Sequence, residues 1–322
     1  MKHLPTWPYK WLVLLCLYCS THTSVSAQTD IDAIMMAKNN YCSGLMYGSS
    51  RWNQYWEGTQ KRTNENLGTV STKMIGYMGN YGVSGKLNIL FGLPYIETKA
   101  SDGTLHGQKG LQDLSLWIKW MPVERSLGPG TFSVYGLAGV STPVSNYTPD
   151  FLPMSIGLHS KNLSLRGMVD YQIGAWSTTV SATYIARSNV KLDRSSYYTT
   201  QLYLTNEVEM PDASSVNVRT GYRSGRLIAE AVFNKWTTLG GFDITKNNMP
   251  FPSNRMNATS FGFNLKYSLK AVSGLSLIGD AEWVTAGRNV GQSTMWSGGI
   301  FYIIDFSRKP KGSMNSTTDN HK

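Results

Sequence analysis

The sequence predicts an all-β fold, a transmembrane antiparallel β-barrel of about 12 strands that follows a cleaved signal peptide. Three observations predict it: strict alternation of apolar and polar residues, a secretory signal at the N-terminus, and connections that alternate between long and compact. In residues 260–270, SFGFNLKYSLK, every second residue from Phe261 to Leu269 is apolar, and the intervening residues are glycine, polar or basic. Successive residues of a strand point to opposite faces. A membrane barrel turns its apolar face to lipid and its polar face to the lumen.

The N-terminus has the layout of a secretory signal peptide. Lys2 and Lys10 precede the apolar run WLVLLCLYC at 11–19, and Val25 and Ala27 occupy the −3 and −1 positions of a small-residue cleavage site. The apolar run has about half of the roughly 20 residues that a membrane-spanning helix needs. We therefore expect cleavage after Ala27 and export of the remaining chain.

Cysteine and histidine usage argues against a metal or cofactor site. Cleavage removes Cys16 and Cys19 and leaves only Cys42, which excludes an intramolecular disulfide and a cysteine metal cluster from the mature chain. The mature chain retains three scattered histidines without ligand spacing: His106, His159 and His321. One loop carries three acidic residues that could contact calcium but are more often only solvated: Glu207, Glu209 and Asp212. We expect no cofactor and no metal.

No catalytic constellation stands out. A lipid-modifying enzyme of the outer membrane would need a serine–histidine pair with an orienting polar group. The adjacent residues His159 and Ser160 would point to opposite faces of a strand and would not meet. The chain also lacks a nucleic-acid-binding motif, and export argues against nucleic acid as a partner.

The alternation recurs in five further segments: 86–97, 112–120, 163–171, 215–223 and 275–283. Their apolar faces end in aromatic residues that suit a membrane–water boundary: Tyr95, Trp120, Tyr171, Tyr222 and Trp283. The opposite faces carry the charges that we predict to line the lumen: Asp113, Lys119, Arg166, Asp170, Arg219, Lys266, Asp280 and Glu282. These charges either select solutes or pair across the interior and hold the barrel shape. Their mixed signs favour the second interpretation.

The connections between the predicted strands alternate in kind. The compact ones are 84–86, 123–130, 172–175, 223–226 and 271–274. The longer ones are 58–66, 100–109, 143–153, 190–213, 239–255 and 288–292. Together they join about 12 strands, with the longer loops outside the cell and both termini in the periplasm. Residues 190–213 could form one more hairpin, which would raise the number to about 14.

We predict four parts along the chain: a signal peptide (1–27), a short periplasmic segment (28–38), the barrel (39–306) and a polar basic tail (307–322). The second part could form a short periplasmic or inserted helix. The last strand, SGGIFYIIDF, ends at Phe306, which resembles the terminal aromatic residue read by the outer-membrane insertion machinery. The tail is a departure, because such signals usually close the chain.

Two of the longer loops carry aromatic residues among proline and glycine: Tyr147, Phe151, Phe242 and Phe251. Two interpretations are open. These rings either pack over the barrel mouth and shield it, or they form an apolar entry for a hydrophobic solute, since binding pockets pair aromatic walls with few polar groups.

Two neighbouring motifs carry a resemblance to a known family: NYGVSGKLNILFGLPYIETKAS (80–101) and GLQDLSLWIKW (110–120). They resemble the outer-membrane barrels grouped as transporters of the meta-pathway of phenol degradation, and their Bacteroidota relatives. The elements that match are Tyr81, Gly82, Val83, Leu87, Leu93, Pro94, Tyr95, Gly110, Leu111, Asp113 and Leu114. The resemblance implies a barrel that admits small hydrophobic or aromatic molecules.

Taken together, the sequence predicts a monomeric barrel of the bacterial outer membrane that passes a small solute, with lipids and the insertion machinery as its other partners. Three alternatives remain open. One is a non-conducting barrel with a role in adhesion or assembly, and another is a lipid-modifying enzyme. The third is a soluble secreted β-sandwich, in which the apolar faces would form a core.

Overall fold

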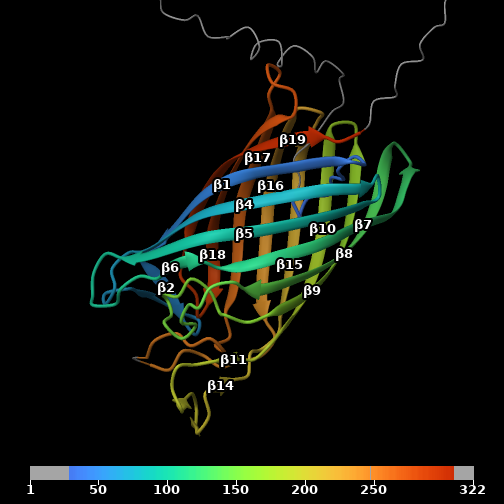
Figure 1. Cartoon of the computed structure of the whole chain (residues 1–322). Coiled ribbons are helices and arrows are strands. Elements are labelled where there is room, and N and C mark those ends of the chain that lie inside the picture. Colours follow the sequence, from blue (N-terminus) through green and yellow to red (C-terminus); the bar gives the residue numbers. More distant parts are fainter. Residues whose placement is uncertain (1–28, 247, 308–322) are drawn as a thin grey trace, which may run out of the picture.

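The computed structural model describes residues 29–246 and 248–307. Twelve antiparallel strands form the barrel wall: β1 (Asn40–Trp52), β4 (Val70–Ser84), β5 (Leu87–Ala100), β7 (Asp113–Leu127), β8 (Gly130–Pro143), β9 (Asn162–Ile173), β10 (Trp176–Arg187), β15 (Ala213–Arg223), β16 (Leu227–Thr238), β17 (Asn257–Ser268), β18 (Leu275–Arg288) and β19 (Thr294–Asp305). Each pairs with its neighbours in sequence, and β1 pairs with both β4 and β19. The sheet therefore closes on itself (Figure 1), and the predicted fold class is confirmed.

The short strands lie in the long loops. They are β2 (Gln54–Glu57), β3 (Gln60–Thr63), β6 (Lys109–Leu111), β11 (Val190–Lys191), β12 (Tyr197–Tyr198), β13 (Leu202–Tyr203) and β14 (Glu207–Val208). Within 190–213, β11 pairs with β14 and β12 with β13, and neither pair joins the barrel sheet. The barrel thus has 12 strands, and the alternative of 14 is wrong. Among the described residues, no helix is long and apolar enough to cross a bilayer.

The outer wall is apolar and exposed. Phe261, Phe263 and Leu265 of β17 are 52%, 63% and 52% exposed, whereas the alternate residues Ser260 and Lys266 are buried inside the barrel. A soluble sandwich would bury the apolar face, so this alternative is wrong. Because the bilayer offers no hydrogen-bond partners, a closed barrel with an apolar exterior is the form in which strands span it.

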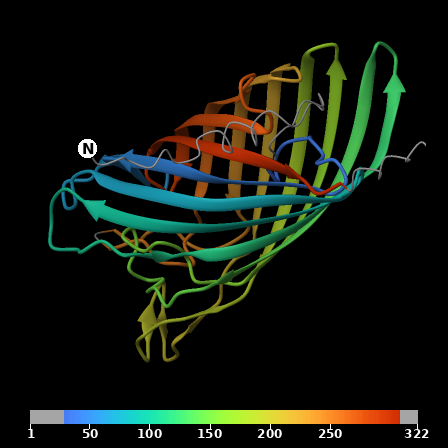
Figure 2. The same cartoon turned by 45° about the horizontal axis from the view of Figure 1, so that its top comes forward.

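Figure 1 shows the compact connections at the end of the barrel where the described chain begins and ends, and the long loops at the opposite end. One compact connection differs from the prediction. The ladder between β7 and β8 resumes at the pair Val123–Val134 after a bulge and continues to Leu127–Gly130, so the turn is only residues 128–129. Beyond Trp120, β7 pairs with β8 but no longer with β5. This hairpin consequently projects past its neighbours (Figure 2).

Candidate functional site in the barrel interior

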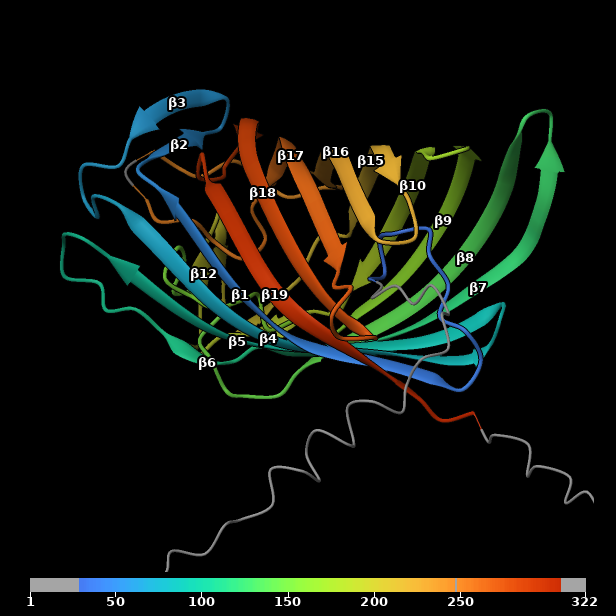
Figure 3. The same ribbon diagram turned by 90° about the horizontal axis from the view of Figure 1, so that it is seen from above.

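Residues 29–39 lie inside the barrel and form no helix (Figure 3). The expected helix is therefore absent from the described part of this segment. Residues 29–34 lie close to the inner face of β7–β9, whereas Met36 packs with residues of β1, β18 and β19. Lys119 of β7 is completely buried, and its ammonium donates to the carbonyl oxygens of Thr29 (3.2 Å), Asp32 (2.6 Å) and Ile34 (2.9 Å) and to the Asp32 carboxylate (3.0 Å). A segment that belongs to no β-ladder must find hydrogen-bond donors for its backbone carbonyl groups elsewhere. Side chains of the barrel wall supply these donors here.

Two further side chains of the wall hold the same segment. The Arg166 guanidinium of β9 donates to the carbonyl oxygen of Asp30 at 2.8 Å and to its carboxylate at 2.9 Å. The Tyr135 hydroxyl of β8 donates to the carbonyl oxygen of Ala33 at 2.8 Å. The methyl group of Ala33 packs in an apolar cluster with interior residues of the wall: Met121, Tyr135, Leu137 and Met168. The segment is thus fixed by charge, hydrogen bonds and packing together.

A second ion network runs along the inner wall from β9 to β15 and β16. Arg223 binds Asp170 and Glu230, each at 3.1 Å, and Arg219 binds Glu230 at 3.3 Å. All four side chains are at least nine-tenths buried. Buried charges are tolerated when they are paired and hydrogen-bonded in this way, so these four side chains satisfy one another along the inner wall.

Two cavities lie within the described part of the barrel interior. The loop-side cavity, about 270 Å³, is bounded by residues 29–34 and by β1, β4 and β15–β19. The turn-side cavity, about 330 Å³, lies near the compact connections and is bounded by residues 33–35 and by β7–β9 and β15. Ile34 lines both cavities. The N-terminal segment therefore separates two spaces within one barrel.

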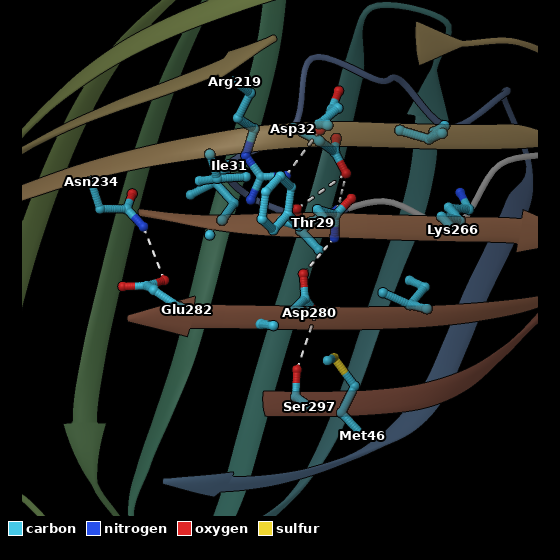
Figure 4. A pocket seen from close by; sticks show the side chains of 18 of the residues that line it. Thr29, Ile31, Asp32, Met46, Arg219, Asn234, Lys266, Asp280, Glu282 and Ser297 are labelled. Atoms are coloured by element: carbon cyan, nitrogen blue, oxygen red, sulfur yellow. Dashed lines mark hydrogen bonds and ion pairs between the residues drawn. The ribbon is translucent and has the colours of Figure 1, made fainter. Parts of the chain in front are cut away.

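The loop-side cavity combines carboxylates with an apolar lining (Figure 4). Asp280 accepts hydrogen bonds from Asn264 and from Ser297 at 3.1 Å. Glu282, two residues along the same inward face, accepts from Ser260 (2.6 Å) and Asn234 (3.0 Å). Sulfur and aliphatic side chains provide the apolar part: Met46, Met74, Met78, Ile228, Val232 and Ile278. Such a lining suits a small molecule with both polar and apolar parts.

The eight residues predicted to line the lumen all have inward positions, but they do not form one continuous lining. Lys119, Arg166, Asp170 and Arg219 are in ion pairs. Arg219, Lys266, Asp280 and Glu282 line the loop-side cavity. Asp113 lies at the loop end, where it accepts a hydrogen bond of 2.6 Å from Tyr147.

The prediction missed four charges of the interior ion pairs: Asp30, Asp32, Arg223 and Glu230. The alternation in 215–223 places Arg223 on the inward face, and the pattern LIAEAVFN of β16 would have placed Glu230 there as well. Asp30 and Asp32 belong to a segment without periodicity, so no pattern could place them. The predicted cleavage site at Ala27 lies outside the described residues.

The loop aromatics pack within the loops rather than presenting free faces. Tyr147 is 7% exposed and lies with Ile96 and Ile156, and Phe151 packs beside Met154. Phe251 is buried in a cluster that includes Phe242, with its ring 5.3 Å from that of Tyr197. These contacts favour the shielding interpretation over an apolar entry made of exposed rings.

Asn289, a buried residue with a φ of 54°, joins three of the long loops. Its amide oxygen accepts from the backbone N–H groups of Gly58 (2.8 Å) and Ile244 (3.1 Å). Its amide nitrogen donates to Asp243, which also makes a two-pronged ion pair with Arg288 at 2.7 and 2.6 Å. The Arg288 hydrogen bonds hold the pKa of Asp243 at about 2. The loops thus form a connected cap at their end of the barrel.

The other candidate groups do not assemble into a site. The ring of His159 lies edge-on to Tyr147 at 4.8 Å, while Ser160 donates to Asn162 at 3.0 Å. Within residues 29–246 and 248–307, no three His, Cys, Asp or Glu side chains are grouped to hold a metal ion. In the acidic loop, Glu207 accepts from Asn189 and Asp212 accepts from the backbone of Arg187.

No protein-family model and no curated protein sequence matches the chain. Among solved structures, an outer-membrane channel from Pseudomonas putida F1 is similar over 87% of this chain and 100% of that chain, with 13% sequence identity and a TM-score of 0.67. The translocator domain of the autotransporter NalP from Neisseria meningitidis is similar over 83% of this chain and 88% of that chain, with 10% identity and a TM-score of 0.44. At these identities the similarity concerns the fold alone. The chain has the fold of an outer-membrane β-barrel, and its apolar outer wall places it in the bacterial outer membrane.

Proposed function

We propose that this protein is an outer-membrane channel for passive uptake of small hydrophobic or aromatic solutes, and that residues 29–38 move when a solute passes. The observation that carries the proposal is the pair of cavities, about 270 and 330 Å³, on either side of one short irregular segment. Each is large enough for a small molecule, because an apolar cavity of about 150 Å³ holds benzene. The path runs from the loop end through the loop-side cavity, past Ile34, to the turn-side cavity.

The orientation follows from the loop lengths. Long loops of outer-membrane barrels face the outside and short turns face the periplasm. Residues 29–38 then enter the lumen from the periplasmic side, and the protein functions as a monomer. The resemblance to transporters of phenol degradation and the similarity in fold to the outer-membrane channel from Pseudomonas putida F1 support a channel for small solutes.

A non-conducting barrel with a role in adhesion or assembly is the second candidate. The observation that favours it is the number of contacts on the N-terminal segment, above all the four oxygen atoms around the buried Lys119 ammonium. A segment held in this way permanently would leave the loops as the functional surface.

Deletion of residues 29–35 tests whether this segment closes the lumen. The deletion leaves Met36, which packs with Cys42 and Ile278, in place. The purified wild-type protein and the deletion variant are reconstituted in liposomes, and arabinose uptake and ion conductance are measured. A channel predicts low flux for the wild type and high flux for the deletion variant. Lys73→Met, a change of an exposed lysine of β4, is the matched control and should behave as the wild type.

The solute class needs a second measurement. Porin-deficient cells that express the wild-type protein should take up radiolabelled toluene faster than cells with an empty vector. If cells that express the wild-type protein show no added uptake, the channel is ruled out in favour of the non-conducting barrel, even where the deletion variant conducts.

A further inference from the structure

Six carboxylates of the barrel interior fall into two groups. Four of them make ion pairs of 2.9–3.3 Å with lysine or arginine: Asp30, Asp32, Asp170 and Glu230. Within the described part of the chain, Asp280 and Glu282 make no ion pair and accept only from neutral amide and hydroxyl donors. Both line the loop-side cavity, and among the five carboxylates of its lining they are the two without an ion pair.

The charge count of this cavity is unbalanced. Its lining contains five carboxylates (Asp30, Asp32, Glu230, Asp280 and Glu282) and two cations (Arg219 and Lys266). Lys119 and Arg166, which lie behind the lining, neutralise Asp32 and Asp30. One negative charge remains. Low-dielectric walls focus such a charge and raise the local concentration of a cation, and a single positive group would restore neutrality.

The neutral donors leave Asp280 and Glu282 with room for a ligand. An ionised carboxylate has about four lone-pair sites, and each of these carboxylates receives two hydrogen bonds from the protein. These bonds fix the orientation of both groups. Their backbones are two residues apart on one strand, which is roughly 7 Å, so one ammonium group can approach both.

The rest of the lining is unsuited to an inorganic ion but suited to an organic body. Only two unpaired carboxylates are present here, whereas calcium takes six or more oxygen ligands. The neighbouring wall consists of thioether and aliphatic groups, among them Met46, Met74, Met78 and Ile278. Methionine adapts its shape and makes favourable contacts with aromatic rings.

We infer that the loop-side cavity binds a small organic monocation, with its ammonium group at Asp280 and Glu282 and its apolar body along the methionine and isoleucine wall. The inference rests on the proposed channel function and names a solute class for it. The volume of about 270 Å³ exceeds the roughly 150 Å³ that holds benzene, which fits an aromatic ring with a short aminoalkyl chain.

The test is equilibrium dialysis of the purified full-length protein in detergent with three probes of similar shape. These are phenethylamine, which is protonated at neutral pH, 2-phenylethanol, which is neutral, and phenylacetate, which is anionic. We expect phenethylamine to bind at least about 10-fold more tightly than the alcohol, because a charge-assisted hydrogen bond is roughly twice as strong as a neutral one. Phenylacetate should bind most weakly.

The double variant Asp280→Asn/Glu282→Gln should lose the preference for the amine and keep its affinity for the alcohol. Asp113→Asn is the matched control, since Asp113 is also an interior carboxylate held by a neutral donor but lies outside the cavity lining. Heat-modifiable gel mobility verifies that each variant retains the barrel. The comparison of the three probes on the wild-type protein needs no variant.

Equal affinity for amine and alcohol, or a preference that survives the double variant, would overturn the inference. Calcium binding that is lost in the double variant, without amine binding, would overturn it in favour of an inorganic cation site. Because binding is measured without transport, its failure differs from failure of the channel proposal, in which the amine binds but no solute crosses the membrane.

Discussion

Replacement of Lys119 by methionine tests how the N-terminal segment is held in the barrel. Methionine keeps most of the length of the side chain and removes the ammonium group, which donates to four oxygen atoms at 2.6–3.2 Å. Removing one partner of a buried ion pair costs about 3–5 kcal/mol. Asp32 would still accept from Thr29 N–H (2.6 Å) and Ile34 N–H (3.1 Å). We therefore expect the lower end, about 3 kcal/mol, as the loss in docking free energy of residues 29–38.

Hydrogen exchange measures this loss directly. A change of about 3 kcal/mol corresponds to a roughly 100-fold larger population of the undocked segment. In detergent, the amide of Ile34 should therefore exchange about 100-fold faster in Lys119→Met than in the wild type, while amides of the barrel strands change little. Lys73→Met, at an exposed position of β4, is the control for loss of charge alone.

A double-mutant cycle with Asp32→Asn separates the ion pair from the backbone contacts of Lys119. The two changes together should cost about 1–3 kcal/mol less than the sum of the single changes, because they share one interaction. If Lys119→Met and Lys73→Met gave the same exchange at Ile34, the ammonium group would not hold the segment. A contact other than Lys119 would then have to hold residues 29–38 in the barrel before the proposed movement.

Three further predictions concern the wall, assembly and the loops. Phe263→Arg should cost about 2–4 kcal/mol of barrel stability in a refolding titration and the inward Asn264→Arg much less; equal costs would contradict the lipid-facing assignment. Phe306→Ala should reduce membrane insertion in cell fractions, and removal of the C-terminal tail should not; the reverse result would place the assembly signal in the tail. Because Arg288 holds the pKa of Asp243 at about 2, below its ordinary value of 3.8, their ion pair stabilises the loops above about pH 4 and is lost as the pH falls toward about 2. The protection factors of amides in that loop should fall in this window, and protection factors that stay constant would rule out the contribution.

The barrel wall could be predicted because its pattern is enforced at every residue. A strand that separates lipid from a polar interior must alternate, and one slip in register would expose polar groups to lipid. The segment 260–270 therefore indicated the lipid-facing residues directly. The turn of the β7–β8 hairpin was misplaced because its two strands continue past the point where apolar and polar residues stop alternating. Glu124 and Arg125 are adjacent in this extension, and both are exposed.

The N-terminal segment could not be predicted, and the reason lies in how its backbone is satisfied. In a strand or helix the hydrogen bonds of the backbone impose a period on the side chains. Here five carbonyl groups, those of Thr29, Asp30, Asp32, Ala33 and Ile34, accept from side chains of the wall at Lys119, Tyr135 and Arg166. Each donor is separated from the carbonyl group that it binds by 85 to 136 positions in the sequence.

That arrangement also decides what the interior charges do. Lys119 and Arg166 were expected to pair with charges on other strands of the wall, and their carboxylates come instead from the N-terminal segment. Some of the interior ion pairs are thus contacts with the N-terminal segment, which continues into the wall at Asn40, the first residue of β1. Such contacts exchange for water when the segment leaves, so wall cations that now hold Asp30 and Asp32 would then face an open lumen. A displaced segment would therefore change both the width and the charge of the path, whereas the unpaired carboxylates Asp280 and Glu282 are present in either state.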